Sequence, residues 1–92
     1  MIYIDNFVTG EGGFGAFIIT KSKSSVSFDT GDLIAIELDS QKYSFNILDM
    51  EPFHRNPNAD HWFLKIDMRA IPEIDYQHLE RTFRGYGEII KP

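Results

Sequence analysis

The chain has 92 residues, no cysteine and a formal net charge of −5, and 42% of its residues are apolar. This length predicts one domain, residues 1–92, and the composition predicts a globular fold. The lack of cysteine excludes disulfides and thiolate chemistry, and the acidic charge argues against direct binding of nucleic acid. No signal peptide or stretch long enough to span a membrane is visible, so we expect a cytoplasmic protein.

The first third of the chain alternates between apolar segments and polar turns. Met1–Val8 predicts a strand, and Thr9–Gly15 predicts a glycine-rich turn. Phe14–Thr20 is nearly continuously apolar, which is typical of a central strand that is covered on both faces. Ser25–Phe28 alternates and predicts a short strand with its two apolar side chains inward.

The strongest strand pattern is Gly31–Met50, where apolar residues alternate with polar ones on both sides of a polar loop, Asp39–Lys42. This pattern predicts a β-hairpin with one buried face. The alternation changes phase at Leu48, which predicts either a bulge or a segment that is buried on both faces. The residues expected on the inner face are Ile34, Ile36, Leu38, Tyr43, Phe45 and Ile47.

The last part of the chain contains one predicted helix. Asp75 is a suitable N-cap, Tyr76, Leu79 and Phe83 share one helical face, and Gly85 is placed to end the helix in a left-handed conformation. Before the helix, Glu51–Asp60 predicts a long, flexible loop and His61–Arg69 an alternating strand; after it, Glu88–Lys91 predicts a short strand.

These elements predict an α+β fold that is mainly β. We expect an antiparallel curved sheet or small open barrel of about six strands, with the single C-terminal helix covering one open side.

Gly10–Gly15 matches the G-x-G-x-x-G pattern of dinucleotide-binding turns. In those turns the pattern opens a helix that holds the pyrophosphate, whereas here a predicted strand follows. We therefore expect a hairpin turn whose glycines supply positive φ angles, with an anion held by the backbone amides of the turn as the alternative.

Asp29-Thr30-Gly31 resembles the Asp-Thr-Gly motif of aspartic proteases, which bring two such aspartates together in one active site. The next residue, Asp32, is charged and expected to be exposed, where that family has a small residue. A later glycine-rich flap is also missing. We expect a turn that leads into the hairpin, and no enzymatic activity.

Four possible metal ligands, Glu51, His54, Asp60 and His61, lie close together in the sequence. Their spacing matches no recognised metal-binding pattern, so we expect no metal and no other cofactor.

Negative charge is concentrated in residues 29–51. Six acidic residues and Lys42 give this segment a net charge of −5, while the remaining eight acidic and eight basic residues cancel. The segment is either a solvated, solubilising face or a surface for a basic partner.

The lack of a catalytic set favours a non-enzymatic interaction protein, whose build is similar to that of immunity proteins, antitoxins and phage-encoded inhibitors. We expect it to bind a basic surface of a partner protein, for example a nucleic-acid-processing enzyme. The alternatives are a small-ligand-binding β-barrel module, with a nucleotide or other anion at the glycine-rich turn, and a structural or accessory subunit of a larger assembly. The expected partner-binding residues are Asp29, Asp32, Glu37, Asp39, Asp49 and Glu51, with Tyr43 as an aromatic anchor if it faces outward.

Overall fold

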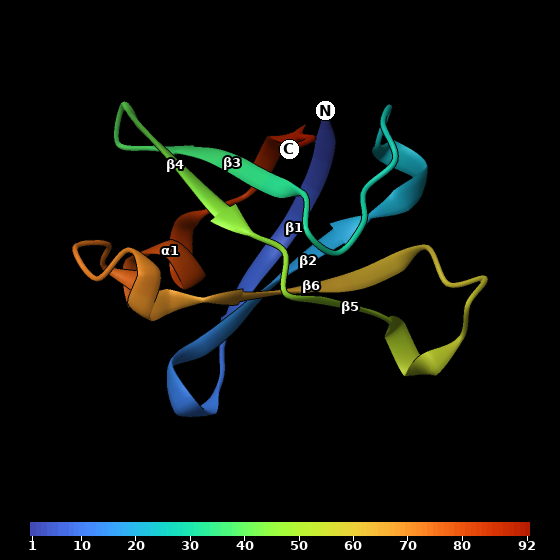
Figure 1. Cartoon of the computed structure of the whole chain (residues 1–92), viewed down its shortest axis with the longest axis horizontal. Coiled ribbons are helices and arrows are strands. Elements are labelled where there is room, and N and C mark those ends of the chain that lie inside the picture. Colours follow the sequence, from blue (N-terminus) through green and yellow to red (C-terminus); the bar gives the residue numbers. More distant parts are fainter.

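The computed structural model describes all residues, 1–92, and shows one curled antiparallel sheet of seven strands with a single α-helix (Figure 1). The sheet order is β4-β3-β7-β1-β2-β6-β5. The predicted fold class is therefore confirmed. No helix has the length and apolarity that a membrane span requires. The elements are β1 (Ile2–Thr9), β2 (Phe14–Thr20), β3 (Leu33–Leu38), β4 (Gln41–Asn46), β5 (Asp49–Pro52), β6 (His61–Asp67), α1 (Tyr76–Thr82) and β7 (Gly85–Ile90), with short 3₁₀ turns η1 (Glu11–Gly13), η2 (Lys21–Lys23), η3 (Phe53–Arg55) and η4 (Met68–Ala70).

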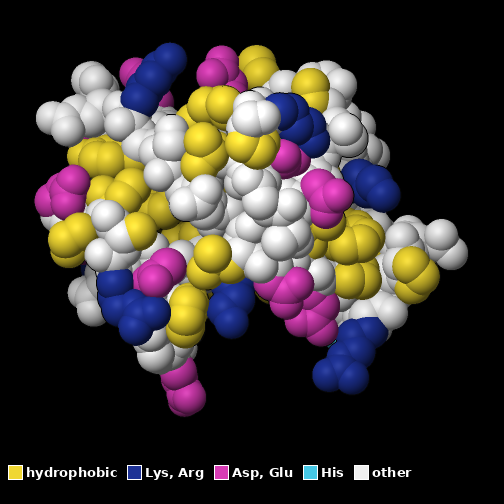
Figure 2. All heavy atoms as spheres, viewed as in Figure 1, with side chains coloured by type: hydrophobic (Ala, Val, Ile, Leu, Met, Phe, Trp, Pro, Cys, Tyr) yellow, Lys and Arg dark blue, Asp and Glu magenta, His cyan; other side chains and the backbone are white.

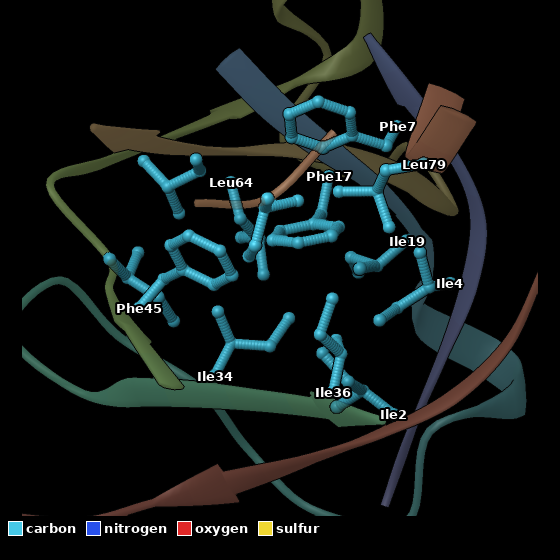
Figure 3. Close-up of a cluster of buried hydrophobic side chains, with 13 residues drawn as sticks. Ile2, Ile4, Phe7, Phe17, Ile19, Ile34, Ile36, Phe45, Leu64 and Leu79 are labelled. Carbon is cyan, nitrogen blue, oxygen red and sulfur yellow. The ribbon is translucent and has the colours of Figure 1, made fainter. Parts of the chain in front are cut away.

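The inner face of the curled sheet forms one hydrophobic core (Figure 3). Alternate residues of each strand point to the same face, so period-two apolar patterns place their side chains on this side. The central strand β2 lies between β1 and β6, and its Phe17 and Ile19 are fully buried. Its other face, which we also expected to be covered, is only partly buried. The core residues are Ile2, Ile4, Phe7, Phe17, Ile19, Ile34, Ile36, Phe45, Ile47, Leu64, Ile66, Ile74 and Leu79.

Four aromatic rings connect the sheet to the helix. Phe7 and Phe17 have ring centroids 5.0 Å apart, and Phe17 lies 5.7 Å from Phe45. Tyr76 of α1 lies 5.9 Å from Phe7 and 6.4 Å from Phe45. Its hydroxyl lies 2.7 Å from the carbonyl oxygen of Ile71. Burial, and then nearby negative charge, raises the pKa of Tyr76 to about 12. The ring thus contributes apolar area while its hydroxyl keeps a partner.

The phase change at Leu48 is neither a bulge nor a segment buried on both faces. The strand is broken there, and β4 and β5 lie at opposite edges of the sheet order. Ile47 is buried, and its N–H donates to the carbonyl of Asp32, 2.9 Å away. The next N–H, of Leu48, donates to the carbonyl of Lys65 in β6, 2.8 Å away. Successive amides of an extended chain point to opposite sides, so these two residues hold the two edges of the sheet together.

The helix begins as predicted, because the Asp75 side chain accepts a hydrogen bond from the His78 N–H. Its end differs from the prediction. The helix stops at Thr82, and Phe83 follows in an extended conformation that directs its side chain toward the core. Gly85 has φ of +146° and starts β7 instead of capping the helix.

The strand predicted at Ser25–Phe28 is absent. The serine side chains bond to the backbone there: the Ser24 hydroxyl accepts from the Tyr3 N–H and donates to the Thr20 carbonyl. Such local bonds compete with a ladder. No backbone hydrogen bond reaches residues 26–28, and Val26 is 42% exposed.

We expect Leu79→Ala to lower the free energy of unfolding by about 2–5 kcal/mol, because Leu79 is fully buried between α1 and the sheet. Phe83→Ala should cost less, since Phe83 is only partly buried. The control is Gln77→Ala at an exposed helix position, which should stay within about 0.5 kcal/mol. Urea melts measure all three. A Leu79→Ala effect no larger than the control would mean that the helix does not pack on the sheet.

Candidate functional site

The hairpin β3–β4 turns through Asp39 and Ser40 alone. Their φ angles are 50° and 68°, so both residues are left-handed, as a two-residue type I′ turn requires. Aspartate tolerates this conformation better than most residues. Gln41 and Lys42, which we expected in the loop, instead begin β4. The turn places Glu37 directly opposite Lys42.

Two exposed carboxylates, those of Glu37 and Glu88, lie on the outer face of the sheet near this turn, and the Asp39 carboxylate of the turn itself lies 3.8 Å from the His78 imidazole of α1. Glu37 is exposed, and the Asp39 side chain is 77% exposed. Glu88 of β7 pairs with Ala35, which points to the same face as Glu37 two residues later. Both glutamates and Lys42 line one hollow of about 150 Å³. We call Glu37, Asp39, Lys42 and Glu88 the hairpin face; three carboxylates and one ammonium give it a net charge of −2.

Two features of the hairpin face are not apparent from the pattern of charge along the chain. Glu88 lies far from the acidic segment in sequence and joins Glu37 only because β7 pairs with β3. Tyr86, on the same side of β7, is 54% exposed and lines the same hollow. The alternation of Tyr86, Glu88 and Ile90 with smaller or buried residues is the signal that places them outward.

The acids of β5 lie beside cations. Asp49 is directly opposite Lys65 of β6. The Glu51 carboxylate lies 3.5 Å from the Arg55 guanidinium, and both side chains are exposed. Two acids and two bases leave this end of the sheet with no net charge.

The acidic residues of the segment 29–51 therefore do not form one surface. The hairpin face and β5 lie at different edges of the sheet order, with the hairpin tip and β5 on opposite sides of the view in Figure 1. Figure 2 shows the acidic side chains in separate groups, with basic and apolar side chains between them. The charge that is continuous in sequence is divided by the fold.

Asp32 is buried rather than exposed as we expected, with a side chain only 8% accessible. Its carboxylate accepts hydrogen bonds from the Lys91 ammonium, 2.6 Å away, and from the Asp29 N–H, 2.9 Å away. The hydrogen bond from Lys91 is the main reason that the pKa of Asp32 lies below its usual 3.8. Asp32 thus links Lys91 to the turn before β3. Because its carboxylate is buried, we no longer count it among the expected partner-binding residues. Asp29 itself is exposed, and its carboxylate accepts from the Thr30 N–H.

Tyr43 does not face outward, so it does not serve as the aromatic anchor of a contact surface. It is half-buried and packs against the core, with its hydroxyl 3.1 Å from the side-chain oxygen of Gln41. Its register beside Ile36 places it on the inner face of the sheet.

The glycine-rich turn is a hairpin turn, as predicted, with Gly12 and Gly13 at φ of 70° and 83°. Its flanking amides are engaged: the Thr9 N–H donates to the Glu80 carboxylate at 2.8 Å, and the Gly10 N–H donates to the Phe14 carbonyl. A Cβ on Gly13 would lie 2.7 Å from Cδ of Arg69. The glycine is therefore explained by the close approach of the arginine, without an anion.

One further pocket and the positions of the possible metal ligands bear on ligand binding. An apolar pocket of about 310 Å³ lies between the segment before β3 and the strands β5 and β6, lined by Val26, Phe28, Met50 and Trp62. Nowhere do three His, Cys, Asp or Glu side chains gather as a metal site would require. His61 lies instead 3.6 Å from Asp5.

We expect Asp32→Asn to lower stability at neutral pH, because it removes the ion pair with Lys91. A carboxyl with a lowered pKa in the folded state stabilises the fold above the unfolded pKa, and this contribution is lost as pH falls through the folded pKa. The difference between wild type and variant should therefore hold between about pH 7 and pH 5 and shrink as the pH falls below about 4, as measured by urea melts. A difference that stays constant with pH would contradict this role of the pair.

Searches for similar proteins do not add to this description. No family model, curated protein or solved structure matches the chain. Any function proposed for it rests on its own residues and geometry.

Proposed function

We propose that the protein is a small non-enzymatic interaction protein that binds a basic surface of a partner protein through the hairpin face. The observation that carries the proposal is the net charge of −2 on this face, set against the cancelled charge of the β5 end. The face also offers a hollow of about 150 Å³ beside the half-exposed ring of Tyr86. An exposed aromatic residue among charged ones is a common composition of contact surfaces.

A basic partner fits the electrostatics of the whole chain. The net charge of −5 attracts a positive surface over a distance of about 8 Å at physiological salt. Such attraction mainly raises the association rate. Nucleic-acid-processing enzymes carry basic channels, so an acidic surface that occupies one would compete with the phosphate backbone.

A small-ligand module at the glycine-rich turn is supported less well. Two amides that flank the turn are already bonded, and Arg69 fills the space beside Gly13. The guanidinium of Arg69 is in turn held by the Asp67 carboxylate at 2.9 Å and 3.1 Å. An anion would have to compete with Glu80 and Asp67 for these donors.

The test compares three double variants, each of which changes the net charge by three units, two from the first substitution and one from the second. Glu37→Lys with Asp39→Asn alters the hairpin face, and asparagine keeps the left-handed conformation at position 39. Glu51→Lys with Asp49→Asn alters the β5 end. Glu11→Lys with Glu73→Gln is the control at exposed sites elsewhere. Glu80 is avoided because it holds the Thr9 amide.

We expect the hairpin-face pair to weaken binding at least about tenfold, or roughly 1.4 kcal/mol, and the control pair to have little effect. Binding is measured by surface plasmon resonance at two salt concentrations, against a protein retained from a lysate of the native host. Higher salt should slow association more than dissociation. Equal losses of affinity in all three variants would mean that the hairpin face contributes only general solubilising charge. No loss of affinity in the hairpin-face pair would refute the proposal.

A further inference from the structure

The two edge strands of the sheet differ in what they offer to another chain. An edge strand presents unpaired backbone N–H and C=O groups, which an added strand can use. In β5 this capacity is reduced. The Met50 N–H donates to the Asp49 carboxylate at 2.9 Å, and Pro52 has no N–H to donate. Two of the four residues of β5 therefore have no free backbone donor, and proline is typical of an edge that is not extended.

The edge of β4 is open by contrast. In a two-residue hairpin the residues that flank the turn, Leu38 and Gln41, form a hydrogen-bonded pair. Hydrogen-bonded and non-bonded pairs then alternate, so the backbone groups of Lys42, Ser44 and Asn46 point away from β3. No strand pairs with β4 on that side, and no side chain caps these amides. Toward Asn46 the edge converges on the crossing to β6, so Lys42 and Ser44 form its open part.

We propose that the partner binds by adding an extended, basic segment to β4 as an eighth strand of the sheet. This inference rests on the proposed function and specifies how the hairpin is recognised. Main-chain hydrogen bonds to Lys42 and Ser44 supply affinity without requiring a particular sequence. The exposed carboxylate of Asp39, in the turn at one end of this edge, then favours a segment that carries basic residues.

A second copy of the chain is a poor occupant of this edge. Two copies bring together net charges of −5 each, and the acidic turns would add to the repulsion. A single edge with two open residues also buries far less than the roughly 1,200 Å² at which stable interfaces begin. A segment of opposite charge avoids the repulsion, because it is attracted to the turn.

The register sets the chemistry of the segment. Antiparallel addition, the more stable arrangement, places the C-terminal end of the segment beside the turn at Asp39. Lysine or arginine therefore belongs at this end. The residue opposite Lys42 cannot be basic, because like charges directly across a ladder repel. Residues beside the half-buried Tyr43 face inward and are best apolar.

The test uses a synthetic probe with this pattern, acetyl-Val-Thr-Val-Thr-Val-Lys-Lys-amide. One control peptide carries the two lysines at the N-terminus instead. Another replaces the second threonine, whose N–H faces Lys42 when the central valine lies opposite Tyr43, with proline at unchanged charge. Binding is followed by ¹⁵N-resolved NMR titration and amide hydrogen exchange. The protein variant Ser44→Pro removes an outward N–H without breaking a bond to β3, and proline is tolerated on edge strands.

We expect the probe to shift the Lys42 and Ser44 amides most strongly and to slow their exchange. The peptide with N-terminal lysines should bind roughly threefold more weakly, as loss of an exposed ion pair predicts. The proline peptide and Ser44→Pro should abolish the shifts. No saturable binding, shifts centred on β5, or equal binding of the proline peptide would overturn the inference. The exchange measurement on the wild type decides the matter even if Ser44→Pro fails to fold.

Failure of the inference can be told apart from failure of the proposed function. Ser44→Pro and the hairpin-face pair are both tested against the partner retained from the lysate. Loss of binding in the hairpin-face pair but not in Ser44→Pro would leave the charged surface and refute strand addition. Loss in Ser44→Pro alone would support strand addition and refute the role of charge. Loss in neither would refute both.

Discussion

The fold depends on two consecutive hydrogen bonds, from Ile47 to the carbonyl of Asp32 and from Leu48 to the carbonyl of Lys65. In the sheet order, β4 and β5 lie at opposite edges. Ile47 and Leu48 join these two edges, so that the sheet curls around its apolar inner face. Ile47 is buried at this point, whereas Leu48, one residue later, is 43% exposed. The apparent phase change in the sequence is the point at which the chain exchanges one neighbouring strand for another.

The same crossing decides where the negative charge lies. Residues before it belong to the hairpin, and residues after it belong to β5, next to the cationic side of β6. Lys65 faces Asp49 across the ladder, and Lys91 holds Asp32. Both lysines come from outside the acidic segment. A concentration of charge along the chain is therefore weak evidence for a charged surface, because strand pairing brings in counter-charges from elsewhere.

Backbone and charge would have separate roles in binding at the hairpin. Long-range attraction acts before contact and favours basic partners, whereas the open amides of β4 act only after an extended segment has aligned. The two edges of the sheet support this division, because the donors of β5 are capped or missing while those of β4 are free. Edge strands are usually protected against added strands. The unprotected edge of β4, beside the exposed Asp39, is therefore the feature of this molecule that most strongly suggests a binding role.

Local patterns in the sequence determined most of the elements. Apolar segments located β1 and β2, period-two alternation located β6 and the hairpin, and Asp75 with Leu79 located the helix. These signals are local, because side-chain direction and capping depend on near neighbours. The divided acidic surface, the burial of Asp32, the pairing of Glu88 beside Glu37 and the contrast between the two edges were decided only by the tertiary structure. Each depends on which strands pair and in which register, and pairing between distant segments is set by burial of the whole inner face and not by any local pattern.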